Sequence, residues 1–398
     1  MNKGISIIIP TYNGGEIFIR CLEKIGQQKY GGPVQLIVID SGSTDGTAEL
    51  AEEAGALVRR IHKKQFHHAR TRNEALSLTN FDKVIFTVQD AIPCSDTWLL
   101  DLENSINQHD VAAVYTDQIP HDDANLYARF ENQSIRDFRG QELVLQSLDS
   151  VESFRKMPYY DAYRAIALDN VCAIYRKELL VNIPFPEMDF AEDLAWSFEN
   201  MLKGRSVLYQ PGIKVKHSHN RLPEYGFNRQ IANSIWCAKI MRRVANDMSC
   251  LNAKDLISLT GAVNTFVGRV RSKLFNAGNA LCNNSGKEPR AIDRIVRRYS
   301  LKNRVRWLLI DCLSRNRKQE SPELRSIEEQ TKQDILNILE LMKTKYNATS
   351  KSELLEALEQ IVANLLGRIY GEVYASCMLN GKMSSEIEDF IKPYRKGI

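Results

Sequence analysis

The chain has 398 residues, of which 53 are Lys or Arg and 49 are Asp or Glu, giving a formal net charge of +4. This length predicts roughly two or three domains, and a charged fraction of 26% excludes a collagenous, low-complexity or wholly disordered protein. The small net charge argues against nucleic acid as a partner, because a dedicated binder must neutralise many phosphates. The apolar runs are too short for a signal peptide or a membrane span, and the eight cysteines form no C-x-x-C pair. We therefore expect a cytoplasmic protein that meets a membrane only peripherally, at the inner face of the plasma membrane.

The first 220 residues alternate strand-like and helix-like segments. The strand-like runs are 5–9, 34–39, 57–61, 83–88 and 111–115. The helix-like stretches between them are 17–25, 48–54, 71–78 and 98–106. Continuous apolar strands separated by helices predict a Rossmann-like α/β fold, with a mostly parallel sheet and helices on both faces. Residues 120–165 show no clear pattern.

From about residue 225 the strand signals stop and helical periodicity takes over. Leu354, Leu358, Ile361 and Leu365 follow one another in steps of four, three and four, which is typical of a helix packed in a bundle. We therefore expect an α/β domain over residues 1–225 and an α-helical C-terminal domain over residues 226–398. The helical domain could serve a membrane surface, a homo-oligomer or a docking partner.

A dense basic run lies inside the expected helical domain. Its members are Arg290, Arg294, Arg297, Arg298, Lys302, Arg304 and Arg306. A basic helix face beside Trp307 could rest on an anionic membrane surface, where each cation contributes about 1 kcal/mol. An ordinary solvated helix face explains the same pattern, so both interpretations stay open.

Polar side chains follow three of the predicted strands at the points where those strands end. Thr11 and Tyr12 suit hydrogen bonding and stacking on a flat base, and Asp40 can accept from a ring N–H or from ribose hydroxyls. Asp90 offers the hard oxygen that Mg²⁺ or Mn²⁺ prefers when the ion also holds diphosphate. Ligands bind at this edge in such sheets, although acids at these positions also serve as turn and cap residues. No G-x-G-x-x-G or G-K-S/T loop is present, which disfavours dinucleotide and P-loop binding.

Five motifs, in order, resemble the inverting family-two glycosyltransferases with the GT-A fold. They are IIIPTYNGG, VIDSGSTDGT, FHHARTRNEAL, FTVQDAIP and FAEDLAW, within residues 3–225. The QDA-P segment and the later VKHSHN are similar to bacterial rhamnosyltransferase-type members, which build surface polysaccharides. The resemblance implies a nucleotide-diphosphate sugar donor and a glycan or lipid-linked glycan acceptor. L-Rhamnose from dTDP-rhamnose is the leading donor, and a UDP-hexose is the next.

The resemblance also implies roles for individual residues. Those expected to bind the donor are Pro10, Thr11, Tyr12, Asp40, Arg72, Gln89 and Asp90. Asp90 stands at the metal motif, and His217 or His219 matches a late histidine that contacts metal or diphosphate in some relatives. Gln89-Asp90-Ala91 supplies one carboxylate where the full motif supplies two or three, so we expect weak binding of Mg²⁺ or Mn²⁺ without donor.

Asp193 matches the catalytic base, which takes the proton of the acceptor hydroxyl as that oxygen attacks the anomeric carbon. It lies at an expected helix N-terminus, where an ionised carboxylate is favoured. Glu192 is the rival base, and the two acids could also be a dipole pair without catalysis. Two other functions stay open: a catalytically inactive GT-A-fold protein that binds glycans or acts as a scaffold, and a sugar nucleotidyltransferase. The latter needs a basic glycine-rich loop, which the segment 10–15 lacks.

Overall fold

The computed structural model describes residues 3–276, 321–348 and 350–394. The chain divides into two compact units, the first made of Met1–Asp123 and Glu131–His219 and the second of Ala124–Phe130 and Asn220–Ile398. The basic run from Arg290 to Arg306 lies outside the described residues, so its contact with an anionic membrane stays a prediction. Within the described part of the chain, no helix is both long and apolar enough to cross a membrane.

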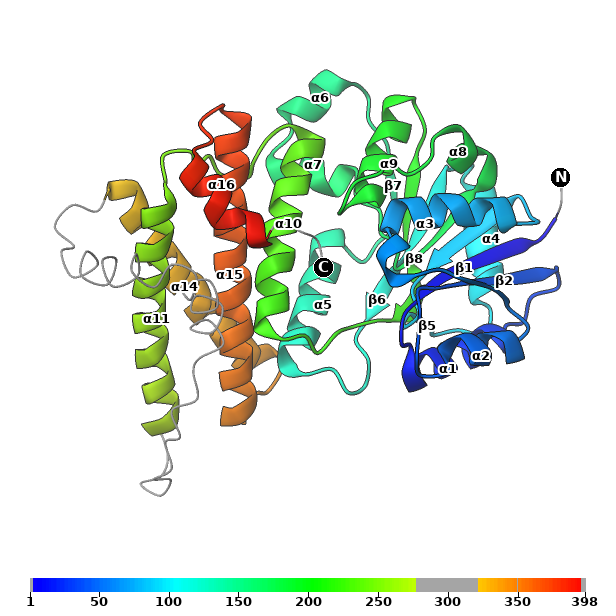
Figure 1. Ribbon diagram of the computed structural model, residues 1–398, viewed down its shortest axis with the longest axis horizontal. Coiled ribbons are helices and arrows are strands. Elements are labelled where there is room, and N and C mark those ends of the chain that lie inside the picture. The colour runs from blue at the N-terminus through cyan, green and yellow to red at the C-terminus, as the bar shows by residue number, and fades with distance from the viewer. Residues whose placement is uncertain (1–2, 277–320, 349, 395–398) are drawn as a thin grey trace. The chain divides into compact units, whose positions relative to one another are not determined.

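The first unit is built on one nine-stranded sheet with the strand order β3-β2-β1-β4-β8-β6-β9-β5, in which β7 also pairs with β9 (Figure 1). The strands are β1 (Ile5–Thr11), β2 (Val34–Asp40), β3 (Leu57–Arg60), β4 (Lys83–Thr87), β5 (Ile92–Pro93), β6 (Ala113–Ile119), β7 (Val144–Gln146), β8 (Cys172–Arg176) and β9 (Val207–Lys216). All five predicted strands are present, with ends shifted by a few residues at most.

The sheet is parallel in its first half and mixed in its second half. Strands β3, β2, β1 and β4 are parallel neighbours, as predicted. Strand β8 then runs antiparallel to both β4 and β6, whereas β9 is parallel to β6 and antiparallel to β5 and β7. The sheet is therefore less parallel than expected, because β5, β7, β8 and β9 come from segments for which no strand was predicted.

Helices cover both faces of this sheet (Figure 1). Those of the first unit are α1 (Gly15–Gly26), α2 (Thr47–Glu53), α3 (His68–Ala75), α4 (Trp98–Gln108), α6 (Val151–Lys156), α7 (Tyr159–Ala165), α8 (Lys177–Asn182) and α9 (Glu192–Leu202). Helix α5 (Leu126–Arg139) has its first residues in the second unit and the rest in the first. Phe18 of α1 and Trp98 of α4 belong to one apolar cluster with Ile7 of β1. On the opposite face, the rings of Tyr175 and Trp196 meet edge to face with centroids 5.0 Å apart.

The second unit is helical, in agreement with the expected C-terminal fold class. Its other helices within the described residues are α10 (Pro223–Met241), α11 (Ala253–Asn276), α14 (Pro322–Lys345), α15 (Lys351–Leu379) and α16 (Ser385–Ile391). Helices α10 and α15 approach closely at Gly367, where an added Cβ would lie 2.4 Å from the backbone oxygen of Phe227. Leu354, Leu358 and Ile361 are buried in this core, as their helical spacing predicted.

Candidate active site

The ends of β1 and β2 place Thr11 and Asp40 side by side. The two residues are directly paired in the parallel register, and Thr11 Oγ1 lies 3.4 Å from Asp40 Oδ1. Asp40 Oδ2 accepts hydrogen bonds from the backbone N–H groups of Gly42 and Ser43, each at 3.0 Å, and the Ser43 hydroxyl donates to Oδ1. Asp40 is thus buried and also organises the following turn, the alternative role considered for acids at strand ends.

Tyr12 and Gln89 are held together although 77 positions separate them in the sequence. The Tyr12 backbone N–H donates to Gln89 Oε1 at 2.8 Å, and Gln89 Nε2 donates to the Tyr12 carbonyl at 3.3 Å. These two bonds join the loop after β1 to the loop after β4. Tyr12 remains exposed beside half-buried Pro10, and the Lys63 ammonium lies 3.9 Å from the centre of the Tyr12 ring. Lys63 was not predicted, although its place after the third predicted strand was a usable signal.

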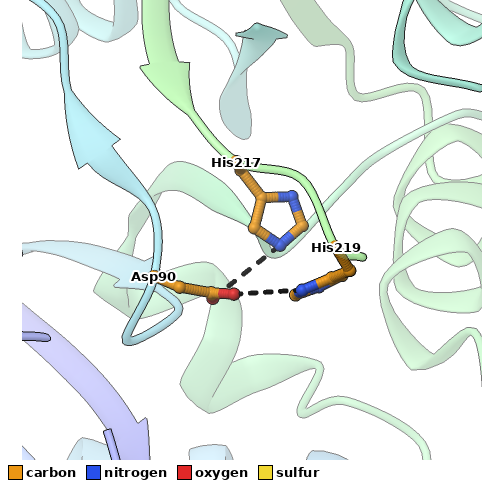
Figure 2. A group of neighbouring side chains, drawn as sticks. All are labelled: Asp90, His217 and His219. Carbon is orange, nitrogen blue, oxygen red and sulfur yellow. Dashed lines mark ion pairs between the residues drawn. The ribbon is translucent and has the colours of Figure 1, made fainter. Parts of the chain in front are cut away.

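Asp90, His217 and His219 form a compact cluster of potential metal ligands (Figure 2). One ligand atom from each residue lies within 4.8 Å of the others. His219 Nδ1 is 3.2 Å from Asp90 Oδ2, and His217 Nε2 is 3.8 Å from Asp90 Oδ1. His121, which was not predicted, makes a 3.0 Å hydrogen bond between its Nε2 and the Asp90 carbonyl. The structure therefore brings both predicted histidines to the predicted acid, with a third histidine fixing the loop that carries it.

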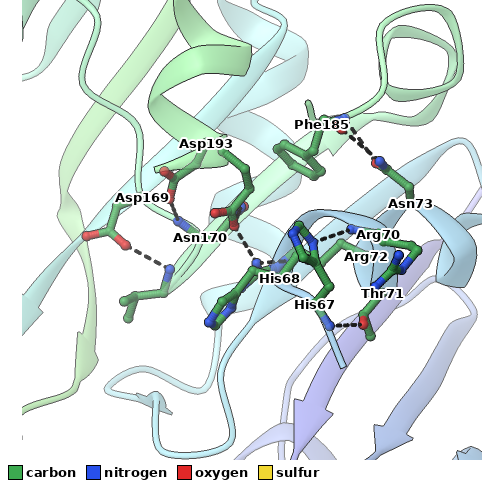
Figure 3. A network of polar contacts seen from close by, with 12 residues as sticks. His67, His68, Arg70, Thr71, Arg72, Asn73, Asp169, Asn170, Phe185 and Asp193 are labelled. Atoms are coloured by element: carbon green, nitrogen blue, oxygen red, sulfur yellow. Dashed lines mark hydrogen bonds and ion pairs between the residues drawn. The ribbon is translucent and has the colours of Figure 1, made fainter. Parts of the chain in front are cut away.

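Asp193 and Glu192 begin helix α9, but their surroundings differ. Glu192 is buried and forms an ion pair with Arg72 of α3, whose Nη1 also donates to the His68 carbonyl. Asp193 is half-buried, and its carboxylate accepts from the backbone N–H of Asn170 at 3.0 Å and of Leu194 at 2.8 Å (Figure 3). Arg72 was expected to contact the donor. In the structure its Nη1 contacts Glu192 and the His68 carbonyl.

The pKa of Asp193 is raised to about 7. Burial is the largest cause, followed by the negative charges of Glu192 and Asp169, while hydrogen bonds from Asn170 and Leu194 oppose the shift. We expected the helix N-terminus to favour the ionised form of Asp193. That expectation is wrong for the pKa as a whole, because desolvation and nearby negative charges outweigh the effect of the helix terminus. The helix begins one residue earlier than expected, after Ala191, whose backbone is left-handed with φ of 63°.

The segment 169–171 connects the histidine cluster to Asp193. Its Asn170 N–H binds Asp193, and its Val171 carbonyl accepts from the Thr87 hydroxyl at the end of β4. Asp169 Oδ2 accepts from Gln118 Nε2, and Gln118 Oε1 in turn contacts His217 Nδ1. The two predicted acids, Asp90 and Asp193, are thus linked through one edge of the sheet.

Asp169 is a half-buried acid that was not predicted. Its Oδ2 lies 2.7 Å from Arg139 Nη2, and Val171 N–H donates to its Oδ1 at 2.9 Å. Burial alone would raise the pKa of Asp169, but the charge and hydrogen bond of Arg139 outweigh it and lower the pKa to about 2. Arg139 comes from the segment that showed no clear sequence pattern, which explains why this pair was missed.

Two solved structures are among those to which this chain is similar. The chain has a TM-score of 0.42 and 18% identity to TarS of S. aureus in complex with UDP-GlcNAc, covering 61% of this chain and 68% of that one. The mannosyltransferase PcManGT from Pyrobaculum calidifontis, in complex with GDP-Man and Mn²⁺, gives a TM-score of 0.45 at 16% identity, covering 89% and 85%.

Sequence relatives are more similar. The chain is 33% identical over 241 residues to the O-antigen chain rhamnosyltransferase RfbN of Salmonella typhimurium, covering 59% of this chain and 72% of RfbN. It is 31% identical over 239 residues to the O-antigen chain rhamnosyltransferase WbaN of Salmonella anatum, covering 58% and 72%. Residues 6–181 match the family model described as Glycosyl transferase family 2. With the mixed α/β sheet, these matches show that the chain belongs to the family-two glycosyltransferases and has a GT-A-type fold.

Proposed function

We propose that this glycosyltransferase moves a sugar, with inversion, from a nucleotide-diphosphate donor to a hydroxyl of a glycan or lipid-linked glycan in bacterial surface polysaccharide synthesis. L-Rhamnose from dTDP-rhamnose is the leading donor, because both Salmonella relatives are O-antigen chain rhamnosyltransferases. A UDP-hexose is the second choice. The observation that carries the proposal is the link, through the segment 169–171, between the cluster at Asp90 and the acid with a raised pKa, Asp193.

Asp193 is the proposed general base. A base works best when its pKa lies near the working pH, and the pKa of about 7 meets that condition. The hydrogen bonds from Asn170 and Leu194 fix the direction of the carboxylate, so the acceptor hydroxyl meets an oriented group. Glu192 suits this role less well, because its carboxylate is buried and bound to Arg72.

The loops after β1, β2 and β4 are the proposed donor site. Tyr12 presents an exposed ring for stacking on the base, and its backbone is fixed by Gln89. Thr11 and Asp40 lie at the adjoining ends of β1 and β2, and Lys63 adds a positive charge suited to a nucleoside diphosphate. Pro10 lies in β1 just before this loop and limits its backbone freedom.

The cluster of Asp90, His217 and His219 fits a divalent cation by the chemistry of its atoms. Two imidazole nitrogens and one carboxylate oxygen suit Mn²⁺ better than Mg²⁺, which prefers an all-oxygen set. A cation held there would supply positive charge for the leaving diphosphate. Three protein ligands leave coordination positions for phosphate oxygens, in line with the expected need for donor.

A donor screen followed by product analysis tests the proposal. The purified full chain is heated with dTDP-rhamnose, UDP-hexoses and GDP-mannose, each with and without Mn²⁺. A donor present at one hundred times its Kd should stabilise the protein by about 2.7 kcal/mol. The stabilising donor is then incubated with a polysaccharide acceptor, and the anomeric configuration of the product is read by NMR. Retention of the donor's configuration, or no transfer from any donor, would contradict the proposal.

A further inference from the structure

The side chain of Gln118, at the end of β6, bridges His217 and Asp169. Gln118 Nε2 lies 2.6 Å from Asp169 Oδ2, and Gln118 Oε1 lies 2.8 Å from His217 Nδ1. Gln118 is only 8% exposed, so water competes little for these bonds. The amide therefore meets an acid on one side and an imidazole on the other.

The chemistry of Asp169 decides which way this amide faces. An ionised carboxylate only accepts hydrogen bonds, and Asp169 is held ionised against Arg139, 2.7 Å away. The amide group that faces Asp169 must therefore be the NH₂ group of Gln118. The carbonyl oxygen must then face His217, and this oxygen also only accepts.

His217 Nδ1 must therefore carry a proton and donate it to Gln118 Oε1 in a hydrogen bond. A neutral imidazole carries one N–H, so a proton at Nδ1 leaves the lone pair on Nε2. Nε2 is the atom that faces Asp90 in the cluster, and at 3.8 Å from Asp90 Oδ1 it is too far away to donate a hydrogen bond to that carboxylate (Figure 2). A lone pair at that atom is what a metal ligand needs, whereas an N–H there would block coordination.

We propose that Gln118 is a positioning residue that holds His217 in the tautomer with its proton on Nδ1 and its lone pair on Nε2. Asp169 and Arg139 act one step further away, because they fix the direction of the Gln118 amide. The consequence for metal binding rests on the proposed function. The tautomer itself is a property of the protein without metal and is tested separately.

The first test reads the tautomer directly. The full chain is labelled with ¹⁵N-histidine, freed of metal and measured by long-range ¹H–¹⁵N NMR at about pH 8, above the ordinary histidine pKa of about 6.5. The His217 signal is assigned by its loss in His217→Asn. We expect a protonated Nδ1 and a bare Nε2. A wild-type spectrum with the proton on Nε2 overturns the proposal, whatever any variant does.

The second test compares two variants that each remove a side-chain contact to His217. Gln118→Met removes the contact to the ring, whereas Asn132→Ala removes the 3.0 Å bond from Asn132 Nδ2 to the His217 backbone carbonyl. Mn²⁺ binding is measured by EPR in the presence of dTDP. We expect Gln118→Met to bind Mn²⁺ about 10–100-fold more weakly and to lose the tautomer preference, and Asn132→Ala to keep both.

The outcomes separate this inference from the proposed function. Equal Mn²⁺ affinity and an equal spectrum in Gln118→Met and wild type would overturn the positioning role and leave the metal centre intact. Absence of Mn²⁺ binding in wild-type protein, with dTDP present, would instead overturn the proposed metal centre, and the tautomer would still be decided by NMR. If Gln118→Met fails to fold, Asp169→Asn replaces it. Without the charge that directs the amide, both tautomers are expected, and a spectrum like that of wild type counts against the proposal.

Discussion

Asp169 belongs to the segment 169–171 and Asp193 accepts a hydrogen bond from that segment, yet their pKa values move in opposite directions. Burial tends to raise both. At Asp169 the Arg139 guanidinium outweighs burial and lowers the pKa to about 2. At Asp193 the charges of Glu192 and Asp169 add to burial, and the pKa rises to about 7. The cation that could balance the second site, Arg72, forms its ion pair with Glu192 instead.

The difference teaches how one residue type takes two roles within one edge of a sheet. An acid paired with a buried cation stays ionised at all ordinary pH values and can only orient its neighbours. An acid among other acids changes its proton near neutral pH and can take part in proton transfer. The position of two arginines, Arg139 and Arg72, therefore separates the structural acid from the proposed catalytic one.

The largest expected effect comes from removing the proposed base. Asp193→Asn keeps the size of the side chain but cannot take the acceptor proton, so turnover should fall by about 10²–10⁴-fold. Binding of dTDP, measured by calorimetry, should be unchanged because the donor loops are not altered. Asp189→Asn is the matched control, since Asp189 is exposed and lies four residues earlier. Equal loss in both variants, or none in Asp193→Asn, would remove Asp193 from the mechanism.

The paired acid should matter for stability instead. Asp169→Asn leaves the largely covered Arg139 charge without its carboxylate. Because Asp169 is itself only half-buried, we expect a cost of about 2 kcal/mol, below the loss of roughly 3–5 kcal/mol typical of a fully buried pair. We expect that loss in urea unfolding at neutral pH. Asp161→Asn is the control, because the Asp161–Arg164 pair is exposed and should contribute less than about 1 kcal/mol. Similar losses from the two substitutions would show that the Arg139 pair is an ordinary surface contact.

The sequence predicted the part of the candidate site that lies at the ends of strands. Thr11, Asp40 and Asp90 follow apolar runs whose parallel arrangement forces their ends to one edge. His217 and His219 were predicted by resemblance, and the structure places both beside Asp90.

The surroundings of Asp169 and Asp193 depend on contacts between distant segments, which no local sequence pattern predicts. Arg139 and Gln118 reach Asp169 from 30 and 51 positions away, and β8, which follows Asp169, is antiparallel where a parallel sheet was expected. The donor contact of Arg72 stays a prediction, and its ion pair with Glu192, 120 positions away, was not predicted. The opposite pKa shifts of Asp169 and Asp193 can therefore be predicted only from a structure that shows these partners.

A smaller effect is expected from the charge beside the base. The base must be ionised to act, so activity should fall as pH drops below about 7 in the wild-type enzyme. Glu192→Gln removes a like charge and lowers the pKa of Asp193, so the acid limb should move to lower pH by roughly one unit. The measurement is kcat against pH, with folding checked by circular dichroism because Arg72 loses its partner. An unmoved acid limb in a folded variant would assign that limb to another group.

The smallest expected effect concerns the free energy of unfolding, which the ionised Asp193 carboxylate should lower as pH rises. Its pKa is raised from 3.8 to about 7 on folding, so the folded state binds more protons than the unfolded state between those values, and stability falls as pH rises across that window. Asparagine does not titrate. The stability of Asp193→Asn relative to wild type should therefore grow between about pH 5 and pH 8, by about 1 kcal/mol because the side chain is only half-buried.

The change with pH, rather than the absolute difference, is the quantity to measure. Asp193→Asn also weakens a hydrogen bond from Asn170 or Leu194. The part of that loss that changes with pH is already contained in the pKa of Asp193, and the constant part cancels in the comparison. With an unfolding entropy of about 2.1 cal/mol/K per residue over 398 residues, thermal unfolding should show a relative gain of roughly 1 °C from about pH 5 to pH 8. A constant difference would mean that Asp193 keeps its ordinary pKa in the folded protein. The contrast with Asp169, and the assignment of Asp193 as a base active near neutral pH, would then both fail.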